Sequence, residues 1–175
     1  MNPDMNIEIR PERDSDFSGI CELVRTAFES AEHTDGDEHN LVGRIRKTLE
    51  YIPELSLVAL CGGRIVGYIM FSRIKIGVFD AVAPAPLAVA ADMRKRGIGR
   101  RLIESGHAIA REMGFSCAVV LGEPSFYSAS GYVPASDYGI SAPFNIPEEY
   151  YMVCPLRPAA SIHAGTVSYS AAFGI

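Results

Sequence analysis

The densest group of reactive side chains in this sequence lies between Arg94 and Arg101. Five of the ten residues from Arg94 to Ile103 are basic, although the chain has a formal net charge of −5. Gly97 and Gly99 lie within the group, and an amphipathic helix is expected from 98 to 113. Backbone N–H groups at a helix N-terminus lack intrahelical partners, and glycine lets an anion approach them closely. The segment therefore predicts a phosphate-binding site.

Two familiar phosphate-binding patterns do not match this segment. It lacks the Gly-Lys-Ser/Thr ending of a Walker loop, and Leu102 stands where the dinucleotide fingerprint has its third glycine. A mononucleotide-binding domain remains an alternative, although an acidic ribose-binding residue is missing at the expected distance. The negative net charge argues against general nucleic-acid binding, because the cationic residues are confined to a short stretch.

The elements around the segment are expected to form one domain of 175 residues. A helix starts at Asp14 or Ser15, and a second helix is expected from about His39 to Tyr51, where Pro53 would end it. Gly62-Gly63 predicts a hairpin turn, 77–86 is expected to be irregular, and a short helix is expected over 124–130. The expected strands are Ile7–Arg10, Leu55–Cys61, Arg64–Ile76, Leu87–Val89, Ser116–Leu121 and Tyr150–Leu156.

Composition excludes several other classes of protein. The four cysteines form no C-x-x-C pair and predict free thiols in a reducing compartment. His33, His39 and His163 make no metal-ligand spacing with them, so we expect no metal. His107 is expected in the middle of its helix, between Ile103 and Ala110, at the boundary between core and solvent. Prolines and Asp80 interrupt the apolar run 78–91, and the N-terminus does not read as a signal peptide, which together predict a cytoplasmic protein without membrane attachment.

Several motifs together resemble the GNAT superfamily of N-acetyltransferases. The pattern Arg-x-x-Gly-x-Gly from Arg94 to Gly99 resembles its pyrophosphate loop, and Leu87-Ala88-Val89 resembles its fourth strand. The run 127–132 resembles its Tyr-x-x-x-Gly-aromatic motif. The segments 121–127 and 138–144 resemble a bacterial subgroup of predicted small-molecule acetyltransferases. Three positions depart from the family pattern: Ala91, Ser130 and Glu123.

The resemblance implies an α+β protein with the acyl-CoA N-acyltransferase (GNAT) fold. That fold is a mixed, mostly antiparallel sheet of six or seven strands with helices on both faces, in which strands 4 and 5 splay apart to admit pantetheine. Residues 1–175 would form a single acetyltransferase domain. The tail 133–175 would complete the sheet and wall the acceptor site, with Tyr138, Phe144 and Tyr150 nearby.

The resemblance also implies a reaction: transfer of an acetyl group from acetyl-CoA to an amine of a small molecule or peptide, by direct attack in a ternary complex. Tyr127 would protonate the leaving thiolate. Glu38 leads the candidates for the general base, ahead of His39, Asp80 and Glu123, and water could also serve. The expected acetyl-CoA contacts are Leu87, Ala88, Val89, Arg94, Lys95, Arg96, Gly97, Ile98, Gly99 and Arg100.

Two points stay open at this stage. A non-catalytic acyl-CoA-binding or regulatory module would carry the same phosphate loop, and Tyr127 is what favours an enzyme over it. The oligomeric state is the second open point, with a homodimer as one alternative.

Overall fold

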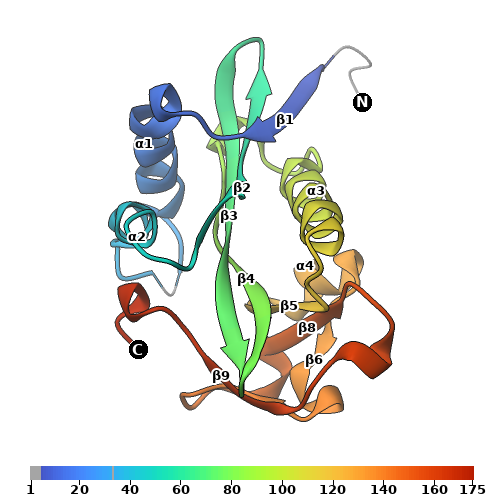
Figure 1. The fold of residues 1–175 in the computed structure, drawn as a ribbon. Helices are drawn as coiled ribbons and strands as arrows, with labels where there is room; N and C mark the ends of the chain where they lie inside the picture. Colours follow the sequence, from blue (N-terminus) through green and yellow to red (C-terminus); the bar gives the residue numbers. More distant parts are fainter. Residues whose placement is uncertain (1–4, 33) are drawn as a thin grey trace.

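A mixed β-sheet forms the centre of the molecule in the computed structural model, which describes residues 5–32 and 34–175 (Figure 1). Seven strands follow one another across it in the order β1-β2-β3-β4-β5-β8-β6. Neighbours along this path pair antiparallel except β4 and β5, which are parallel. The predicted GNAT sheet is therefore confirmed, with two short strands added at one end. The strands are β1 (Ile7–Pro11), β2 (Tyr51–Cys61), β3 (Arg64–Ile76), β4 (Phe79–Val89), β5 (Cys117–Leu121), β6 (Val133–Pro134), β7 (Ile140–Ser141), β8 (Tyr151–Pro155) and β9 (Gly165–Ser168).

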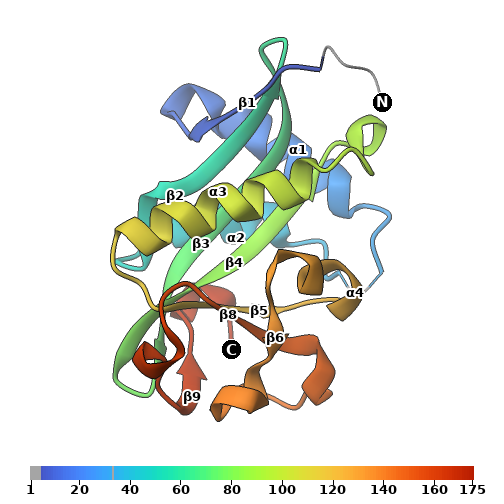
Figure 2. The ribbon, with the colours of Figure 1, turned by 90° about the vertical axis from the view of Figure 1, so that its right-hand side faces the viewer.

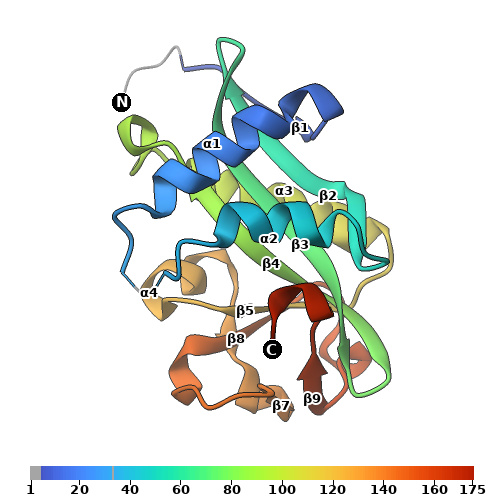
Figure 3. The ribbon, with the colours of Figure 1, turned by 90° about the vertical axis from the view of Figure 1, so that its left-hand side faces the viewer.

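Helices cover both faces of the sheet. α1 (Phe17–Phe28) and α2 (Glu38–Ile45) lie on one face, as Figure 3 shows, and α3 (Ile98–Glu112) crosses the other, as Figure 2 shows. α3 buries Ile98, Leu102, Gly106 and Ala110, which are spaced four residues apart and share one stripe. Met113 was expected in the helix, but it follows the last helical residue, Glu112, and is 44% exposed because Gly114 turns the chain away.

The parallel strands β4 and β5 meet at a single residue pair, Val82 and Ala118. Beyond it, β4 continues to Val89 while β5 ends at Leu121 and leads into the short helix α4 (Pro124–Tyr127). The splay predicted from the family resemblance is thus present. From Ala83 onward, one edge of β4 is no longer paired with β5.

The sequence-based boundaries between α2 and β2 were wrong. α2 ends at Ile45 rather than Tyr51, because a tight turn follows in which the Thr48 N–H donates to the Ile45 carbonyl at 2.9 Å. Pro53 does not stop a helix. It lies in β2, inside an irregularity of the β2–β3 register between Tyr51 and Ser56, where the ladder does not need its missing N–H.

The segment 77–86 was expected to be irregular, and most of it belongs to β4. Pro84 and Pro86 interrupted the strand pattern in the sequence. Both lie at a shift in the β3–β4 register and next to the edge that β5 has left. A strand tolerates proline at such positions, because little hydrogen bonding is lost there.

Candidate active site

The N-terminus of α3 presents unpaired backbone donors at an exposed loop. The first hydrogen bond of the helix joins the Arg101 N–H to the Gly97 carbonyl at 3.0 Å, so the N–H groups of Ile98, Gly99 and Arg100 come before it. Gly97 has φ +79°, and a Cβ built there meets no atom within 4 Å among the described residues. An anion can therefore approach this turn without steric hindrance.

The loop is held at both ends by buried apolar side chains. Met93 and Ile98 are 7% and 1% exposed, whereas the residues from Arg94 to Gly97 between them are exposed. Lys95 adopts φ +60°, an uncommon conformation for a residue with a Cβ. The residues between Met93 and Ile98 therefore form an exposed loop directly before the N-terminus of α3.

The basic side chains of the loop differ in what they contact. Arg94 donates to the carbonyl oxygens of Ala27 at 3.0 Å and Val89 at 3.4 Å, so it ties the loop to α1 and to β4. Arg100 pairs with Glu104 at 2.9 Å on the exposed side of α3. We expected all these cations to surround a phosphate. The hydrogen bonds of Arg94 hold the loop in place against α1 and β4. Contact between a phosphate and any of these basic side chains remains a prediction.

The end of β4 offers backbone groups to the same region. The Ala90 N–H donates to the Val66 carbonyl at 2.9 Å and so points to β3. Because backbone groups alternate along a strand, the N–H groups of Leu87 and Val89 point to the edge from which β5 has departed. That edge can bind an extended polar chain by strand-like hydrogen bonds.

Gly99 lies where three elements converge. A Cβ built at Gly99 would lie 3.4 Å from the Phe126 ring on α4 and 3.8 Å from both Leu87 and Val89 on β4. The start of α3, the free edge of β4 and helix α4 therefore border one region. The sequence-predicted residues 87–89 and 97–99 are brought together here.

Tyr127 is positioned by packing against glycine and two aromatic rings. A Cβ at Gly122 would lie 2.2 Å from the Tyr127 ring, so only glycine leaves room for it. Phe126 and Tyr132 meet the ring edge-on, with centroids 5.0 and 5.3 Å away. Burial raises the pKa of Tyr127 to about 12, so the phenol is protonated at neutral pH and can act as a proton donor.

Behind Tyr127 lies a buried polar cluster that the sequence analysis did not find. His107 Nε2 lies 2.9 Å from the Tyr132 hydroxyl, and Cys154 Sγ lies 3.9 Å from His107 Nδ1. Burial lowers the pKa of His107 to about 4 and raises that of the Cys154 thiol to about 11, so both are neutral. The expectation of a half-exposed His107 was wrong, because α3 turns this residue toward β8.

Glu38 lines a separate cleft of about 480 Å3 on the side of α2. The Thr34 hydroxyl donates to Glu38 Oε1, while Oε2 is buried without a hydrogen-bond partner among the described residues. A buried carboxylate oxygen without a partner lacks the hydrogen bond or cation that such a group usually has. The cleft is lined by Asp35, Asp37, Glu38, Leu41, Arg44, Ala83, Pro84, Ala85, Val119, Leu121, Phe144, Tyr169, Phe173 and Ile175.

The other candidates for the general base do not line this cleft. Asp80 forms ion pairs with Lys75 at 2.6 Å and Arg73 at 3.3 Å near the turn between β3 and β4. His39 and Glu123 are not among the lining residues. His33, which the sequence analysis considered only as a metal ligand, lies outside the described residues. Of the four candidates, Glu38 is therefore the one that lines the cleft and has a carboxylate oxygen without a hydrogen-bond partner among the described residues.

The tail contributes aromatic side chains to the cleft, but only one of the expected three. Phe144 lines it, whereas Tyr138 and Tyr150 do not, and Tyr169 and Phe173 take their place. The aromatic residues in the tail 133–175 were the sequence feature that predicted an aromatic lining of the acceptor site. Which rings turn inward depends on how β9 docks beside β3.

Strand β4 connects the two regions. Ala83, Pro84 and Ala85 line the cleft, and Leu87 to Val89 continue along the same strand to the start of α3. An amine in the cleft and a phosphate at α3 would lie along one strand edge.

In the part of the chain that the structure describes, no helix has the length and apolar character needed to cross a membrane.

Known proteins share this architecture. A family model described as an acetyltransferase (GNAT) domain matches residues 8–135. The chain is 37% identical over 141 residues to the uncharacterized N-acetyltransferase YjhQ of Escherichia coli K12, which covers 78% of this chain and 75% of that protein. It is 34% identical over 135 residues to the uncharacterized N-acetyltransferase YhbS of the same strain, with coverages of 75% and 77%.

Two solved structures are also similar. The crystal structure of E. coli YhbS in complex with CoA has a TM-score of 0.89 at 31% identity, covering 100% of this chain and 96% of that one. A GNAT family acetyltransferase from Brucella melitensis in complex with acetyl-CoA has a TM-score of 0.81 at 27% identity, with coverages of 97% and 99%.

The fold and the family match define an acetyltransferase. The chain belongs to the GNAT family, and it is an N-acetyltransferase similar to YjhQ and YhbS. This assignment gives no support to the alternative of a non-catalytic binding module.

Proposed function

We propose that the protein binds acetyl-CoA along the free edge of β4, with the pyrophosphate at the N-terminus of α3, and acetylates a primary amine bound in the Glu38 cleft. The observation that carries this proposal is the convergence at Gly99, where the helix N-terminus, the β4 edge and α4 meet. The CoA and acetyl-CoA complexes of the two similar structures support it.

The reaction proceeds by direct attack in a ternary complex. The amine nitrogen forms a bond to the acetyl carbon, and the carbon–sulfur bond of the thioester breaks. The N–H groups of Leu87 or Val89 polarise the carbonyl. Glu38 Oε2 accepts the proton lost by the amine, directly or through water, and the Tyr127 hydroxyl protonates the leaving thiolate.

Cofactor binding is tested by isothermal titration calorimetry. The wild type is expected to bind acetyl-CoA with a dissociation constant on the order of micromolar, and dephospho-CoA more weakly if a basic side chain holds the 3′-phosphate. Gly97→Glu should abolish binding, because its carboxylate would occupy the phosphate site. Gly77→Glu is the matched control. Gly77 also has a positive φ, +59°, and open space around it, but it lies in the β3–β4 turn at the opposite end of the sheet (Figure 1).

Binding of ATP or NAD without binding of any CoA species would refute the proposed cofactor. Equal loss in Gly97→Glu and Gly77→Glu would show that backbone strain, rather than the phosphate site, causes the effect.

The general acid is tested by measuring thiol release with an active acceptor. Tyr127→Phe should lower kcat about 100-fold and leave acetyl-CoA affinity nearly unchanged, because only proton donation is lost. Full kcat in Tyr127→Phe would assign Tyr127 a packing role.

A further inference from the structure

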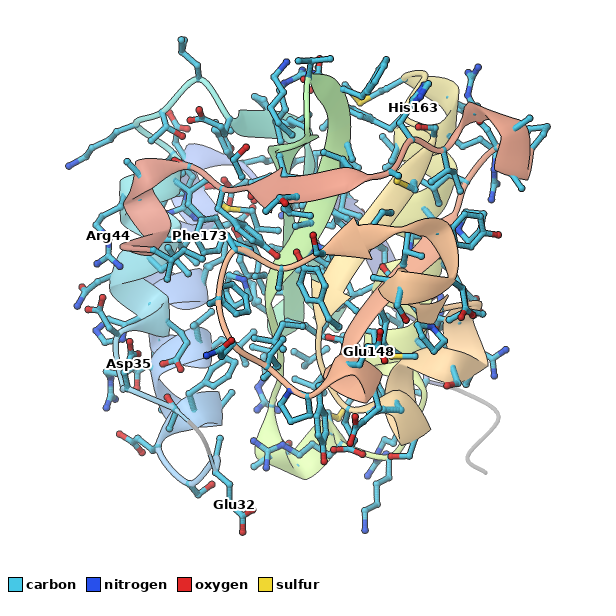
Figure 4. All side chains as sticks on the ribbon, turned by 90° about the horizontal axis from the view of Figure 1, so that it is seen from below. Glu32, Asp35, Arg44, Glu148, His163 and Phe173 are labelled. Carbon is cyan, nitrogen blue, oxygen red and sulfur yellow. The ribbon has the colours of Figure 1, made fainter. Side chains whose placement is uncertain are left out.

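The cleft beside α2 combines an acidic group, Asp35, Asp37 and Glu38, with an aromatic group, Phe144, Tyr169 and Phe173. The aromatic rings form a continuous surface. The centroids of Phe144 and Tyr169 are 6.3 Å apart and those of Tyr169 and Phe173 are 5.3 Å apart. In the view from below, Asp35, Arg44 and Phe173 lie on the same side of the molecule, whereas Glu148 and His163 lie elsewhere (Figure 4).

Most of the acidic group already has partners within the chain. Asp37 pairs with Arg44 at 2.7 Å and accepts from the Asn40 amide at 2.9 Å, and these contacts lower the pKa of Asp37. Asp35 accepts the Asp37 N–H at 2.9 Å and is exposed at the rim. Glu38 Oε2 is the buried oxygen of the group that has no hydrogen-bond partner among the described residues. Glu38 Oε2 is therefore the atom of the acidic group that could accept a hydrogen bond from one positively charged ligand group.

The rest of the interior is apolar. Leu41, Pro84, Val119 and Leu121 join the three aromatic rings in lining a volume of about 480 Å3, which is within the range of sites for small organic ligands. Apolar and aromatic surface favours an aromatic body by area burial and ring stacking. An acidic amine would be repelled by the carboxylates. A polyamine would bring further positive charges to an interior in which the described residues leave one carboxylate oxygen unpaired.

We propose that the acceptor of this acetyltransferase is an arylalkylamine, in which a short aliphatic linker joins an aromatic ring to a primary amine. The ammonium binds Glu38 Oε2, and the ring lies against the aromatic group. This inference rests on the proposed function, because it names the substrate class of the same site. The ammonium passes one proton to Glu38, which releases it to water, and the neutral amine then attacks. Glu38 accepts the second proton as the amide forms, and Tyr127 regains from water the proton that it gave to the thiolate.

Thiol release with a panel of acceptors tests the substrate class. The probes are phenethylamine, tyramine, spermidine, glutamate and a short peptide with a free N-terminus. The kcat/KM for phenethylamine or tyramine should exceed that for spermidine or the peptide at least about 10-fold, and that for glutamate about 100-fold. A preference for spermidine or the peptide would overturn the acceptor class and leave the proposed function standing.

Variants of the aromatic group test where the ring binds. Phe173→Ala should raise the KM for phenethylamine about 10-fold with little change in acetyl-CoA affinity, because contact area with the ring is lost. Phe79→Ala is the matched control, since Phe79 is 44% exposed and stacks on His163, away from the cleft. An unchanged KM in Phe173→Ala would contradict the binding mode.

A measurement without acetyl-CoA separates this inference from the proposed function. Saturation-transfer NMR should detect phenethylamine bound to the wild type and to Glu32→Gln, whose substituted residue is exposed outside the cleft, but not to Glu38→Gln or Phe173→Ala. Binding of phenethylamine combined with no binding of acetyl-CoA would overturn the proposed function alone. Absence of phenethylamine binding in the wild type would overturn the acceptor class, whatever acetyl-CoA does.

Discussion

Gly122 controls the position of the proposed general acid, so Gly122→Ala is expected to impair catalysis without touching either substrate. Gly122 does not have a positive φ, so its backbone accepts alanine. The added methyl group would lie 2.2 Å from Tyr127 Cε2 and 2.6 Å from Cδ2. The ring must therefore move.

The size of the movement follows from these distances. Ordinary van der Waals contact begins near 3.4 Å, so the ring shifts by about 1.2 Å from the 2.2 Å separation. A misplacement of about 1 Å in a reacting group costs on the order of 100-fold in rate, or about 2.7 kcal/mol in activation free energy. Overpacking adds a loss of folding stability of about 1–3 kcal/mol.

The assay compares kcat for thiol release in the wild type, Gly122→Ala, Tyr127→Phe and the double variant. The two single losses should each be about 100-fold, and the double variant should lose little more, because both substitutions remove the same proton donor. Calorimetry should show nearly unchanged acetyl-CoA affinity, and thermal unfolding should confirm a folded protein. Full kcat in Gly122→Ala, or a double loss equal to the product of the single ones, would refute the reasoning.

Three further predictions concern pH and packing. Because the pKa of Tyr127 is raised to about 12, wild-type kcat should not fall between about pH 8 and about pH 10, and a decline there that is absent from Tyr127→Phe would contradict this. A Cβ at Gly106 would lie 2.1 Å from the Phe71 ring, so Gly106→Ala should destabilise the fold by about 1–3 kcal/mol in urea unfolding, whereas Gly43→Ala in α2, with open space around it, should stabilise by about 0.5–1 kcal/mol. The pKa of His107 falls from 6.5 unfolded to about 4 folded, so its stabilising contribution is complete above pH 6.5 and is lost as the pH falls toward 4, by about 3 kcal/mol. Unfolding free energies should depend less on pH over that range in His107→Gln, and an unchanged slope would argue against a buried neutral imidazole.

The sequence alone predicted the features that depend on nearby residues. The turn at Gly62-Gly63 is confirmed, with φ of +56° and +79°, because two successive positive φ values are accessible mainly to glycine. The helix over 98–112 follows from apolar and small residues at four-residue steps. The exposed loop from Arg94 to Gly97 followed from the same local signals, although its role in phosphate binding stays a prediction.

The sequence predicted the ends of helices and strands less well where those ends depend on the surrounding structure. The end of α2 at Ile45 and the inclusion of Pro84 in β4 were missed, because the helical pattern runs on past Ile45 and proline usually interrupts strands. The end of α2 is set by the turn in which the Thr48 N–H donates to the Ile45 carbonyl. The inclusion of Pro84 in β4 depends on the shift in the β3–β4 register and on the loss of β5 as a partner, which are properties of the assembled sheet.

The tertiary structure alone determined which distant side chains form the site. Tyr127 fits against Gly122 only because α4 folds back on the end of β5, and His107 is buried only because α3 packs toward β8. Phe173 and Glu38 line one cleft although more than a hundred residues separate them. Periodicity in a sequence indicates which face of a helix or strand is buried, but it does not indicate which other element will cover that face. Contacts between residues far apart in the sequence form only when the chain folds into its tertiary structure.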